Sequence, residues 1–176
     1  DHPPLTERVT AAELAANPQL IKKARLALAV VPSDDSLKGW ARTFLLVAGL
    51  VRAAGEPVVL VAEEAGTWSD SSAGAQNHKA KVDLIGLATN GRHRNISLVI
   101  VAQRAASVPL TARAQLSEII SFRQDETEDL EALAERIGKE KAEATARLSV
   151  GESIEWRDTL TTPTSKEKTT CSPSLV

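Results

Sequence analysis

Two adjacent carboxylates, Glu63 and Glu64, close an apolar run that begins at Pro57. Its Val and Leu residues lack polar alternation, which is typical of a strand covered on both faces in the middle of a parallel sheet. Ligands of open α/β sheets bind beyond the carboxyl ends of the strands, where carboxylates can hold Mg²⁺ or orient water. The pair predicts such a site, with a merely solvated strand end as the alternative.

Two further predicted strands end in polar residues. Residues 96–104 form an apolar run that reaches Gln103, and residues 118–124 form a run that reaches Arg123. Because the carboxyl ends of parallel strands meet at one edge of a sheet, we expect these side chains near the two carboxylates. An amide there can bond to a phosphate and to an attacking water, and a guanidinium can neutralise charge on a transferred phosphoryl group.

Each of these polar residues also has a structural interpretation. Gln103 can cap the loop that follows its strand. Arg123 can pair with Asp125 or Glu126, and an exposed ion pair of that kind contributes little stability. Arg104 lies one position beyond Gln103, so its side chain is expected to point away from the site.

Arg92, His93 and Arg94 form a compact cluster of cations. They could contact DNA phosphates or a nucleotide bound by a neighbouring subunit. Cations just beyond a helix end also stabilise the helix dipole, so a structural role remains open for all three.

Helix signals surround the predicted strands. Thr10 and Glu13 have the spacing of a capping box that opens a short helix, which ends at Asn17. Apolar residues recur at helical spacing from Leu37 onward until Gly55 supplies a stop signal. Strand, helix and strand in this order are joined by a right-handed crossover, so the sheet is expected to be parallel here.

The remaining segments continue the α/β pattern. Asn90-Gly91 is a favoured left-handed pair at a helix end. The tail 159–176, rich in Thr, Ser, Lys and Pro, is expected to be disordered. We expect loops at 1–10, 65–77 and 105–109, helices around 82–90, 112–116, 127–137 and 139–148, and strands at 25–32 and 150–157, the last in a closing β-hairpin.

The order of the three polar-tipped strands resembles the FtsK/HerA superfamily of DNA-pumping P-loop ATPases, among which viral and phage packaging ATPases are the most similar. The resemblance covers residues 1–157. Its most specific part is the Gly-Arg-His-Arg loop at 91–94, which leads into the strand that ends in Gln103. It implies an α/β fold of three layers, a RecA-like P-loop NTPase core with a mostly parallel sheet.

The resemblance also implies a role for each matching residue. Glu63 stands where the family has Asp, which implies a water-mediated contact to Mg²⁺ through a side chain one methylene longer. Glu64 falls on the catalytic carboxylate that polarises the attacking water. Gln103 matches the polar sensor of the nucleotide, and Arg123 resembles the arginine that acts on the ATP of a neighbouring subunit.

One part of the family pattern is missing from the sequence. P-loop chemistry needs Gly-x-x-x-x-Gly-Lys-Ser/Thr, and Gly138-Lys139 is followed by Glu. The chain begins at Asp1 and holds no Met, so we expect upstream sequence to have been left out. Residues 1–158 then represent a partial P-loop ATPase domain that lacks its first strand and P-loop, and the chain alone is expected to be inactive.

The function implied by the resemblance is ATP-driven translocation or packaging of double-stranded DNA. Its cofactors would be ATP and Mg²⁺, and its subunits would form a homo-oligomeric ring, expected to be a hexamer. Arg92 and Arg94 are the candidates for contact with nucleic acid or a neighbouring subunit. Two alternatives remain: a degenerate, non-hydrolysing structural or regulatory ring subunit, and an unrelated α/β binding domain.

Composition excludes several other classes. The chain has 176 residues with 21 basic and 23 acidic side chains, so DNA contact requires a local patch or a ring of subunits. One cysteine permits neither a disulfide framework nor a zinc cluster. No apolar run approaches the roughly 20 residues of a membrane span. We therefore expect a cytoplasmic protein, in a host cell or associated with the virion if viral.

Overall fold

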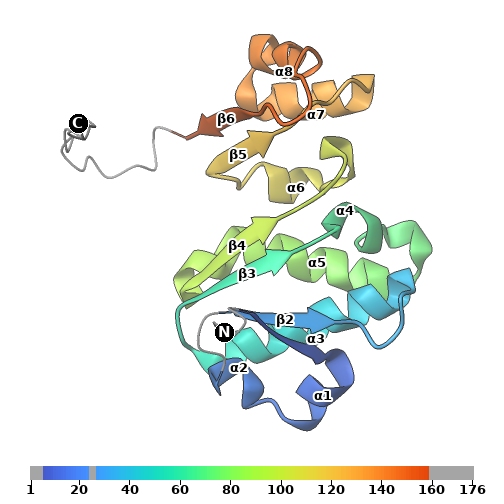
Figure 1. Ribbon diagram of the computed structural model, residues 1–176, viewed down its shortest axis with the longest axis vertical. Helices are drawn as coiled ribbons and strands as arrows, with labels where there is room; N and C mark the ends of the chain where they lie inside the picture. The colour runs from blue at the N-terminus through green and yellow to red at the C-terminus, as the bar shows by residue number, and fades with distance from the viewer. Residues whose placement is uncertain (1–5, 24–26, 159–176) are drawn as a thin grey trace, which may run out of the picture.

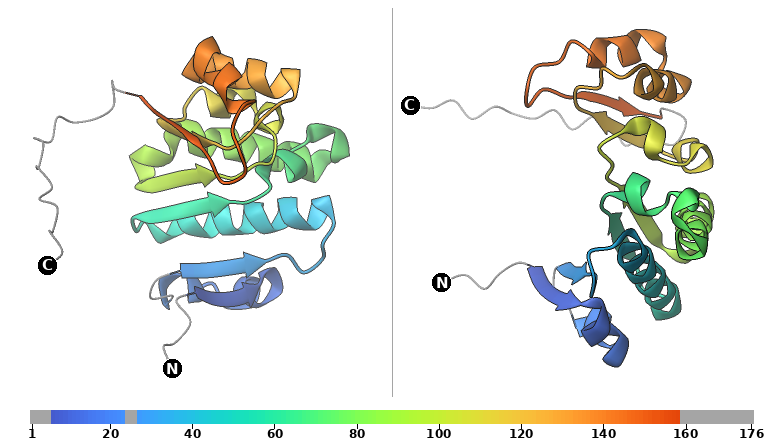
Figure 2. Two further views of the ribbon diagram at one scale, coloured as in Figure 1. Left: turned by 45° about the horizontal axis from the view of Figure 1, so that its top comes forward. Right: turned by 90° about the vertical axis from the view of Figure 1, so that its right-hand side faces the viewer.

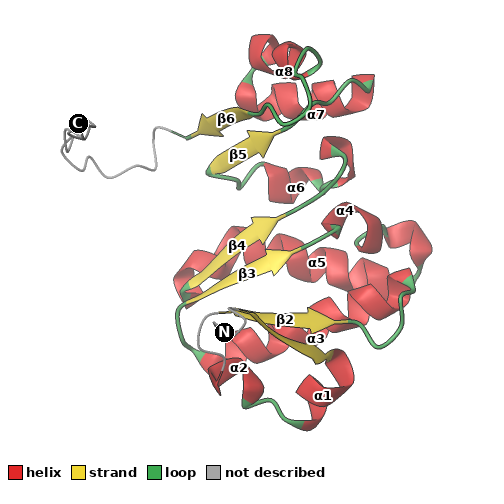
Figure 3. Ribbon diagram, in the orientation of Figure 1, coloured by secondary structure: helices red, strands yellow, loops and turns green. Residues whose placement is uncertain are grey.

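The computed structural model describes residues 6–23 and 27–158. Short strands and helices alternate along the chain, as Figure 3 shows. The strands are β1 (Thr6–Thr10), β2 (Ala27–Val31), β3 (Val58–Ala62), β4 (Ile96–Ile100), β5 (Glu118–Ser121) and β6 (Ile154–Arg157). The α-helices are α1 (Ala11–Ala16), α2 (Leu20–Lys23), α3 (Leu37–Ala54), α4 (Ala65–Trp68), α5 (Ala75–Asn90), α6 (Leu110–Arg113), α7 (Thr127–Ile137) and α8 (Lys139–Thr145). Three 3₁₀ turns complete the order: η1 (Ser71–Ala73), η2 (Gly91–Arg94) and η3 (Ala105–Ser107).

The strands pair in twos within the described residues. β1 with β2 and β3 with β4 are parallel, whereas β5 and β6 are antiparallel. The fold is therefore mixed α/β with small sheets, and Figure 1 shows the three pairs following one another along the molecule. The strand at β6 is confirmed, but α7 and α8 lie between β5 and β6 in the sequence, so the pair is not the expected β-hairpin. The strands on either side of α3, β2 and β3, do not pair with each other, and one continuous, mostly parallel sheet is not observed in the described residues.

Helices cover one face of the strands, as the right-hand view of Figure 2 shows. On the other face, alternate apolar side chains are exposed, with Val59 at 62% and Val61 at 52% in β3. Their counterparts are Val99, Val101, Ile120 and Phe122. The prediction that the 57–62 run is covered on both faces is thus wrong for the described residues. These residues form two layers, one of strands and one of helices, where three layers were expected.

No helix among the described residues is long and apolar enough to span a membrane.

Two apolar cores lie beneath the strands. The larger one packs α3 and α5 against β3 and β4 and includes Phe44, Leu60, Trp68 and Leu84. The smaller one holds α7 and α8 against β5 and β6 and centres on Leu133, Ile137 and Ala142. Burial of a side chain such as Leu or Phe contributes about 1.5–3 kcal/mol, so each core can hold its own strands in place.

The helix signals read from the sequence are largely confirmed. Thr10 and Glu13 form the capping box of α1. The Ser36 side chain accepts a hydrogen bond from the Gly39 N–H at the start of α3, and Gly55 ends that helix in the left-handed region at φ 70°. These local hydrogen bonds satisfy backbone groups that a helix end leaves without partners.

Several local predictions are wrong. Residues 6–10 form β1 rather than a loop, and the expected loop at 65–77 contains α4, η1 and the start of α5. Gly91 has right-handed geometry at φ −56°, and the left-handed residue here is Asn95 at φ 57°. The strands at 96–104 and 118–124 end earlier, at Ile100 and Ser121. The predicted disorder of 159–176 lies outside the described residues.

Gly66 in α4 packs against Ser107 in η3 without room for a side chain. A Cβ at Gly66 would overlap both Oγ and Cβ of Ser107. We therefore expect Gly66→Ala to lower the free energy of unfolding by about 1–3 kcal/mol in a denaturant titration.

Gly86 in the middle of α5 is the matched control, because a Cβ there meets no atom within 4 Å. Gly86→Ala should stabilise the protein by up to about 1 kcal/mol through helix propensity. In a Ser107→Gly background, the cost of Gly66→Ala should fall. An unchanged cost in that background would show that the two elements do not pack as described.

Candidate functional site

Glu64 and Gln103 form a hydrogen bond where β3 and β4 end. Gln103 Nε2 donates to Glu64 Oε1 at 2.8 Å. The parallel register aligns Ala62 with Ile100, and the Val101 N–H, one residue beyond β4, donates to the Ala62 carbonyl at 2.9 Å. The Ala65 N–H then donates to the Val101 carbonyl at 3.1 Å. Glu63 and Glu64 therefore lie between two residues, Ala62 and Ala65, that both bond to Val101. The strand pairing itself therefore brings the two predicted side chains together.

The backbone of Glu64 is in the left-handed region, at φ 51° and ψ 32°. For an L-residue other than Gly this conformation costs about 1–2 kcal/mol, and such outliers gather at functional sites. It turns the chain sharply from β3 into α4 and leaves the Glu64 side chain half-buried. After this strained turn the side chain of the catalytic candidate reaches Gln103, which follows β4.

Trp68 supports this turn from inside the larger core. Its indole Nε1 donates to the Glu63 carbonyl oxygen at 2.7 Å, and its side chain is 2% exposed. Its ring packs on Phe44 with centroids 4.5 Å apart. Asn77, also buried, donates from Nδ2 to the Trp68 carbonyl oxygen at 2.7 Å. The peptide between the two Glu residues is thus anchored to α5 through a buried aromatic ring.

Glu63 presents an exposed side chain beside Glu64. Within residues 6–23 and 27–158, no three His, Cys, Asp or Glu side chains are grouped to hold a metal ion. Mg²⁺ commonly takes one or two protein carboxylates and completes its shell with water and substrate phosphates. The two carboxylates fit that kind of site, and they do not fit a metal cage made of protein ligands alone.

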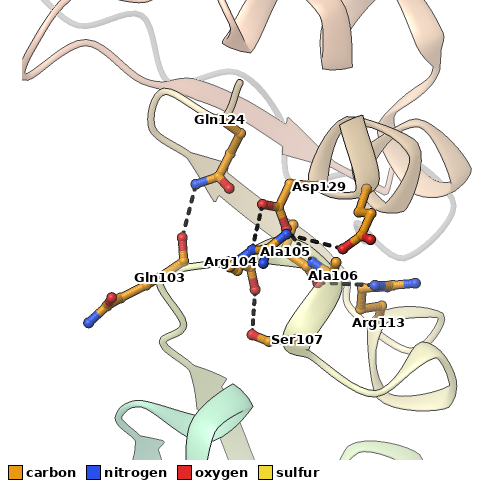
Figure 4. A network of polar contacts seen from close by, with 9 residues as sticks. Gln103, Arg104, Ala105, Ala106, Ser107, Arg113, Gln124 and Asp129 are labelled. Atoms are coloured by element: carbon orange, nitrogen blue, oxygen red, sulfur yellow. Dashed lines mark hydrogen bonds and ion pairs between the residues drawn. The ribbon is translucent and has the colours of Figure 1, made fainter. Parts of the chain in front are cut away.

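Gln103 is also held from the opposite side. Gln124 Nε2, which follows β5, donates to the Gln103 carbonyl oxygen at 3.2 Å (Figure 4). The side chain of Gln103 thus reaches Glu64, while its backbone contacts the segment after β5. Gln124 brings the ends of β4 and β5 close together even though these strands do not pair.

Arg104 turns away from the Glu pair, as expected. Its Nε contacts Asp129 Oδ2 at 3.1 Å and its Nη2 contacts Glu128 Oε2 at 3.2 Å. The hydrogen bond to Asp129, followed by the charge of that carboxylate, raises the pKa of the Arg104 guanidinium above its usual value. Sequence reasoning missed Asp129, because acidic residues in the first turn of a helix are ordinary dipole partners.

Arg123 lies two residues beyond β5 with its side chain 58% exposed. Its Nη2 is 3.7 Å from Asp125 Oδ2, which matches the alternative pairing foreseen from the sequence. An exposed pair at that distance contributes at most about 1 kcal/mol, so it leaves the guanidinium available to another partner. Arg123 directly precedes Gln124, whose side chain contacts the Gln103 backbone.

Arg92 and Arg94 occupy the other end of β4. Both are exposed and belong to η2, which directly precedes that strand. Since a strand rises about 3.3 Å per residue, the five residues of β4 separate η2 from the Gln103 end by roughly 16 Å. The structure therefore does not bring these two Arg residues to the Glu pair within this chain.

Trp68→Phe tests the anchor of the Glu63–Glu64 peptide. Phe keeps an aromatic ring against Phe44 but removes the N–H donor to the Glu63 carbonyl. We expect a loss of about 1 kcal/mol in the free energy of unfolding. Faster hydrogen exchange of the Thr67 amide, which bonds to the Glu64 carbonyl at 2.9 Å, should accompany it.

Trp40→Phe is the control, because Trp40 packs on the same core without belonging to this turn. It should leave exchange at Thr67 unchanged. Equal exchange at Thr67 in both variants would mean that the indole hydrogen bond does not hold the turn.

One of three comparisons with known proteins finds similar structures. No family model matches the chain, and no curated protein matches it. Solved structures of the genome packaging NTPase B204 from Sulfolobus turreted icosahedral virus 2 are similar at 16% identity. The complex with AMPPCP has a TM-score of 0.57 over 85% of this chain and 67% of that one. The complexes with ATP-gammaS and with AMP have TM-scores of 0.51 over 86% of this chain and 67% and 76% of theirs. The chain thus shares the fold of a viral genome packaging NTPase.

Proposed function

We propose that this chain is the water-activating part of an ATPase subunit that moves double-stranded DNA, as in viral genome packaging. The hydrogen bond between Gln103 and Glu64 carries the proposal, because it joins an amide and a carboxylate at the edge where α/β folds bind ligands. The fold shared with a packaging NTPase that was solved with ATP analogues supports this assignment.

Glu64 is the proposed general base. Its carboxylate accepts a proton from the attacking water, and a positioned base of this type contributes about 10²- to 10⁴-fold in rate. Gln103 donates from Nε2, so it keeps the carboxylate oriented and can bond to a terminal phosphate oxygen or to the water. The left-handed turn at Glu64 supplies this orientation before a substrate binds.

Glu63 is the proposed magnesium contact, through a bound water. Mg²⁺ bound with ATP neutralises charge on the phosphates. The exposed Glu63 side chain can accept hydrogen bonds from the metal's water shell, and its carbonyl is fixed by Trp68. A Glu in place of the family's Asp gives the carboxylate a longer reach and a looser position.

The phosphate-binding loop of this ATPase is proposed to come from polypeptide outside the present sequence. The 176 residues hold no Gly-x-x-x-x-Gly-Lys-Ser/Thr. Within the described residues, β4 pairs only with β3 and β5 only with β6. Unpaired strand edges readily accept another strand. A strand pairing with β4 and β5 would deliver a phosphate-binding loop beside Gln103 and complete the sheet of a RecA-like core.

Arg123 is the proposed contact with the ATP of a neighbouring subunit in a homo-oligomeric ring, expected to be a hexamer. Among residues 6–23 and 27–158, the ion-pair partner of its exposed guanidinium is Asp125, at 3.7 Å. Arg92 and Arg94 are proposed to contact DNA or a neighbouring subunit from the other end of the strands. A nearly balanced overall charge requires DNA contacts of this local kind.

A non-hydrolysing ring subunit is the second candidate function. The absence of a phosphate-loop motif from these 176 residues and the Glu at position 63 favour it. The two functions differ in ATP hydrolysis: the first hydrolyses ATP and requires the carboxylate at position 64 to do so, whereas the second does not hydrolyse ATP.

The ATPase proposal is tested in a polypeptide that joins this chain to a phosphate-binding strand and loop. Glu64→Gln should lower kcat by at least about 100-fold, since an amide cannot accept the proton of water. Nucleotide affinity measured by calorimetry should change little, because the amide keeps the size and hydrogen bonding of the carboxylate.

Glu63→Gln is the matched control one residue away. It should raise the Mg²⁺ concentration needed for half-maximal turnover and spare most of kcat at saturating Mg²⁺. Turnover of Glu64→Gln at the parent rate would contradict the assignment. ATP binding by the parent polypeptide without hydrolysis would favour the non-hydrolysing subunit.

Action of Arg123 across a subunit boundary predicts complementation. Subunits carrying Arg123→Ala and subunits carrying Glu64→Gln should each be inactive alone. Mixed rings should regain ATPase activity at interfaces that pair an intact Arg123 with an intact Glu64. An arginine in trans contributes about 10³-fold or more to the rate, far beyond what an exposed ion pair could supply.

ATPase activity is measured at several mixing ratios, and the composition of the rings at each ratio is measured by native mass spectrometry. Asp125→Asn serves as the control and should retain activity, because it removes only the partner seen within the subunit. Verified mixed rings without recovered activity would place the action of Arg123 within its own subunit.

A further inference from the structure

Asp129 is a buried carboxylate that the proposed reaction does not use. It lies in the first turn of α7, its side chain is 1% exposed, and both its oxygens are occupied. Oδ1 accepts from the Ala106 N–H at 2.8 Å and Oδ2 accepts from Arg104 Nε at 3.1 Å (Figure 4). Buried carboxylates are rare unless paired, so this one holds a specific geometry.

The groups that Asp129 binds follow directly after Gln103. Arg104 is the next residue and Ala106 comes two positions later, in η3. Ser107 Oγ donates to the Arg104 carbonyl at 2.7 Å and closes the turn. The chain leaving Gln103 is thus tied to α7 at two points, and Figure 4 shows this network around Asp129.

The two ends of this connection belong to different cores. Glu64 is attached to the larger core through Trp68, whereas Asp129 sits on α7, which forms the smaller core with β5, β6 and α8. Gln103 lies between them, with its side chain on Glu64 and its following residues on Asp129. The distance between amide and carboxylate therefore depends on how the loop is anchored to the smaller core.

We propose that Asp129 is a positioning residue that anchors the loop at 103–107 and thereby holds the Gln103 amide against Glu64. The proposal deepens the function proposed above and rests on it for its catalytic meaning. Arg123 and Gln124 follow β5, which packs on the same core as α7. A neighbouring subunit that engages Arg123 is therefore linked to Gln103 through this anchor and through the hydrogen bond from Gln124 Nε2 to the Gln103 carbonyl.

The test measures exchange of the Gln103 side-chain amide protons with water by NMR in the full 176-residue chain. Glu64→Ala sets the rate for an amide without its acceptor. A hydrogen bond of about 1 kcal/mol corresponds to about five-fold protection. Asp129→Ala should abolish this protection, bringing the Gln103 rate to that of Glu64→Ala, while amide signals of α3 and α5 stay unchanged.

Glu128→Gln is the matched control, because it removes the exposed contact of Arg104 and leaves both contacts of Asp129 in place. It should keep the full protection. Asp129→Asn retains an acceptor for the Ala106 N–H but loses the charge that binds Arg104, so its protection should be intermediate. If Asp129→Ala does not fold, any loss of protection in Asp129→Asn supports the proposal.

Unchanged Gln103 exchange in Asp129→Ala, alongside faster exchange of the Ala106 N–H, would overturn the proposal, since Asp129 would then stabilise the loop without positioning the amide. In an Asp129→Ala variant that does not fold, unchanged exchange in Asp129→Asn overturns it equally. This readout needs no nucleotide. A failure of the ATPase assignment would therefore leave the exchange result intact, and the two failures can be told apart.

Discussion

Parallel pairing of β3 with β4 is the constraint on which the rest of the site depends. The register from Val58 with Ile96 to Ala62 with Ile100 makes both strands end at the same level. A shift of one residue would turn the buried Leu60 and Ala62 outward and the exposed Val59 and Val61 inward. The apolar core beneath β3 therefore fixes the register, and the register brings the chain segments that carry Glu64 and Gln103 to the same edge.

Two polar anchors of different strength act on this edge. The Asp129 carboxylate is buried and accepts hydrogen bonds from two donors, so loss of either donor would leave a buried oxygen without a partner. The Arg123 to Asp125 pair is exposed at 3.7 Å and contributes about 1 kcal/mol at most. The first suits a fixed framework, and the second suits a group that exchanges partners. The placement of these two pairs is consistent with a rigid loop beside a mobile arginine.

A feature of the fold or of the candidate site could be predicted from the sequence where neighbouring residues determine it. The caps of α1 and α3 and the approach of Gln103 to Glu64 follow from neighbouring residues and from strand order, and all are observed. β1 has the largely polar sequence Thr-Glu-Arg-Val-Thr, which carries no local strand signal. It is a strand because it pairs with β2, a segment that is not adjacent to it in the sequence. α4 has only four residues and depends on the burial of Trp68. The burial of Asp129 has no local signal in the sequence, because it arises from the packing of α7 beside η3.

The most direct measurement of the central claim is a crystal structure of this chain, joined to a phosphate-binding loop, with Mg²⁺ and a non-hydrolysable ATP analogue. The account predicts that the terminal phosphate lies within about 3 Å of Gln103 Nε2, with a water between it and the Glu64 carboxylate. A terminal phosphate at the opposite end of β4, beside Arg92 and Arg94, would contradict it.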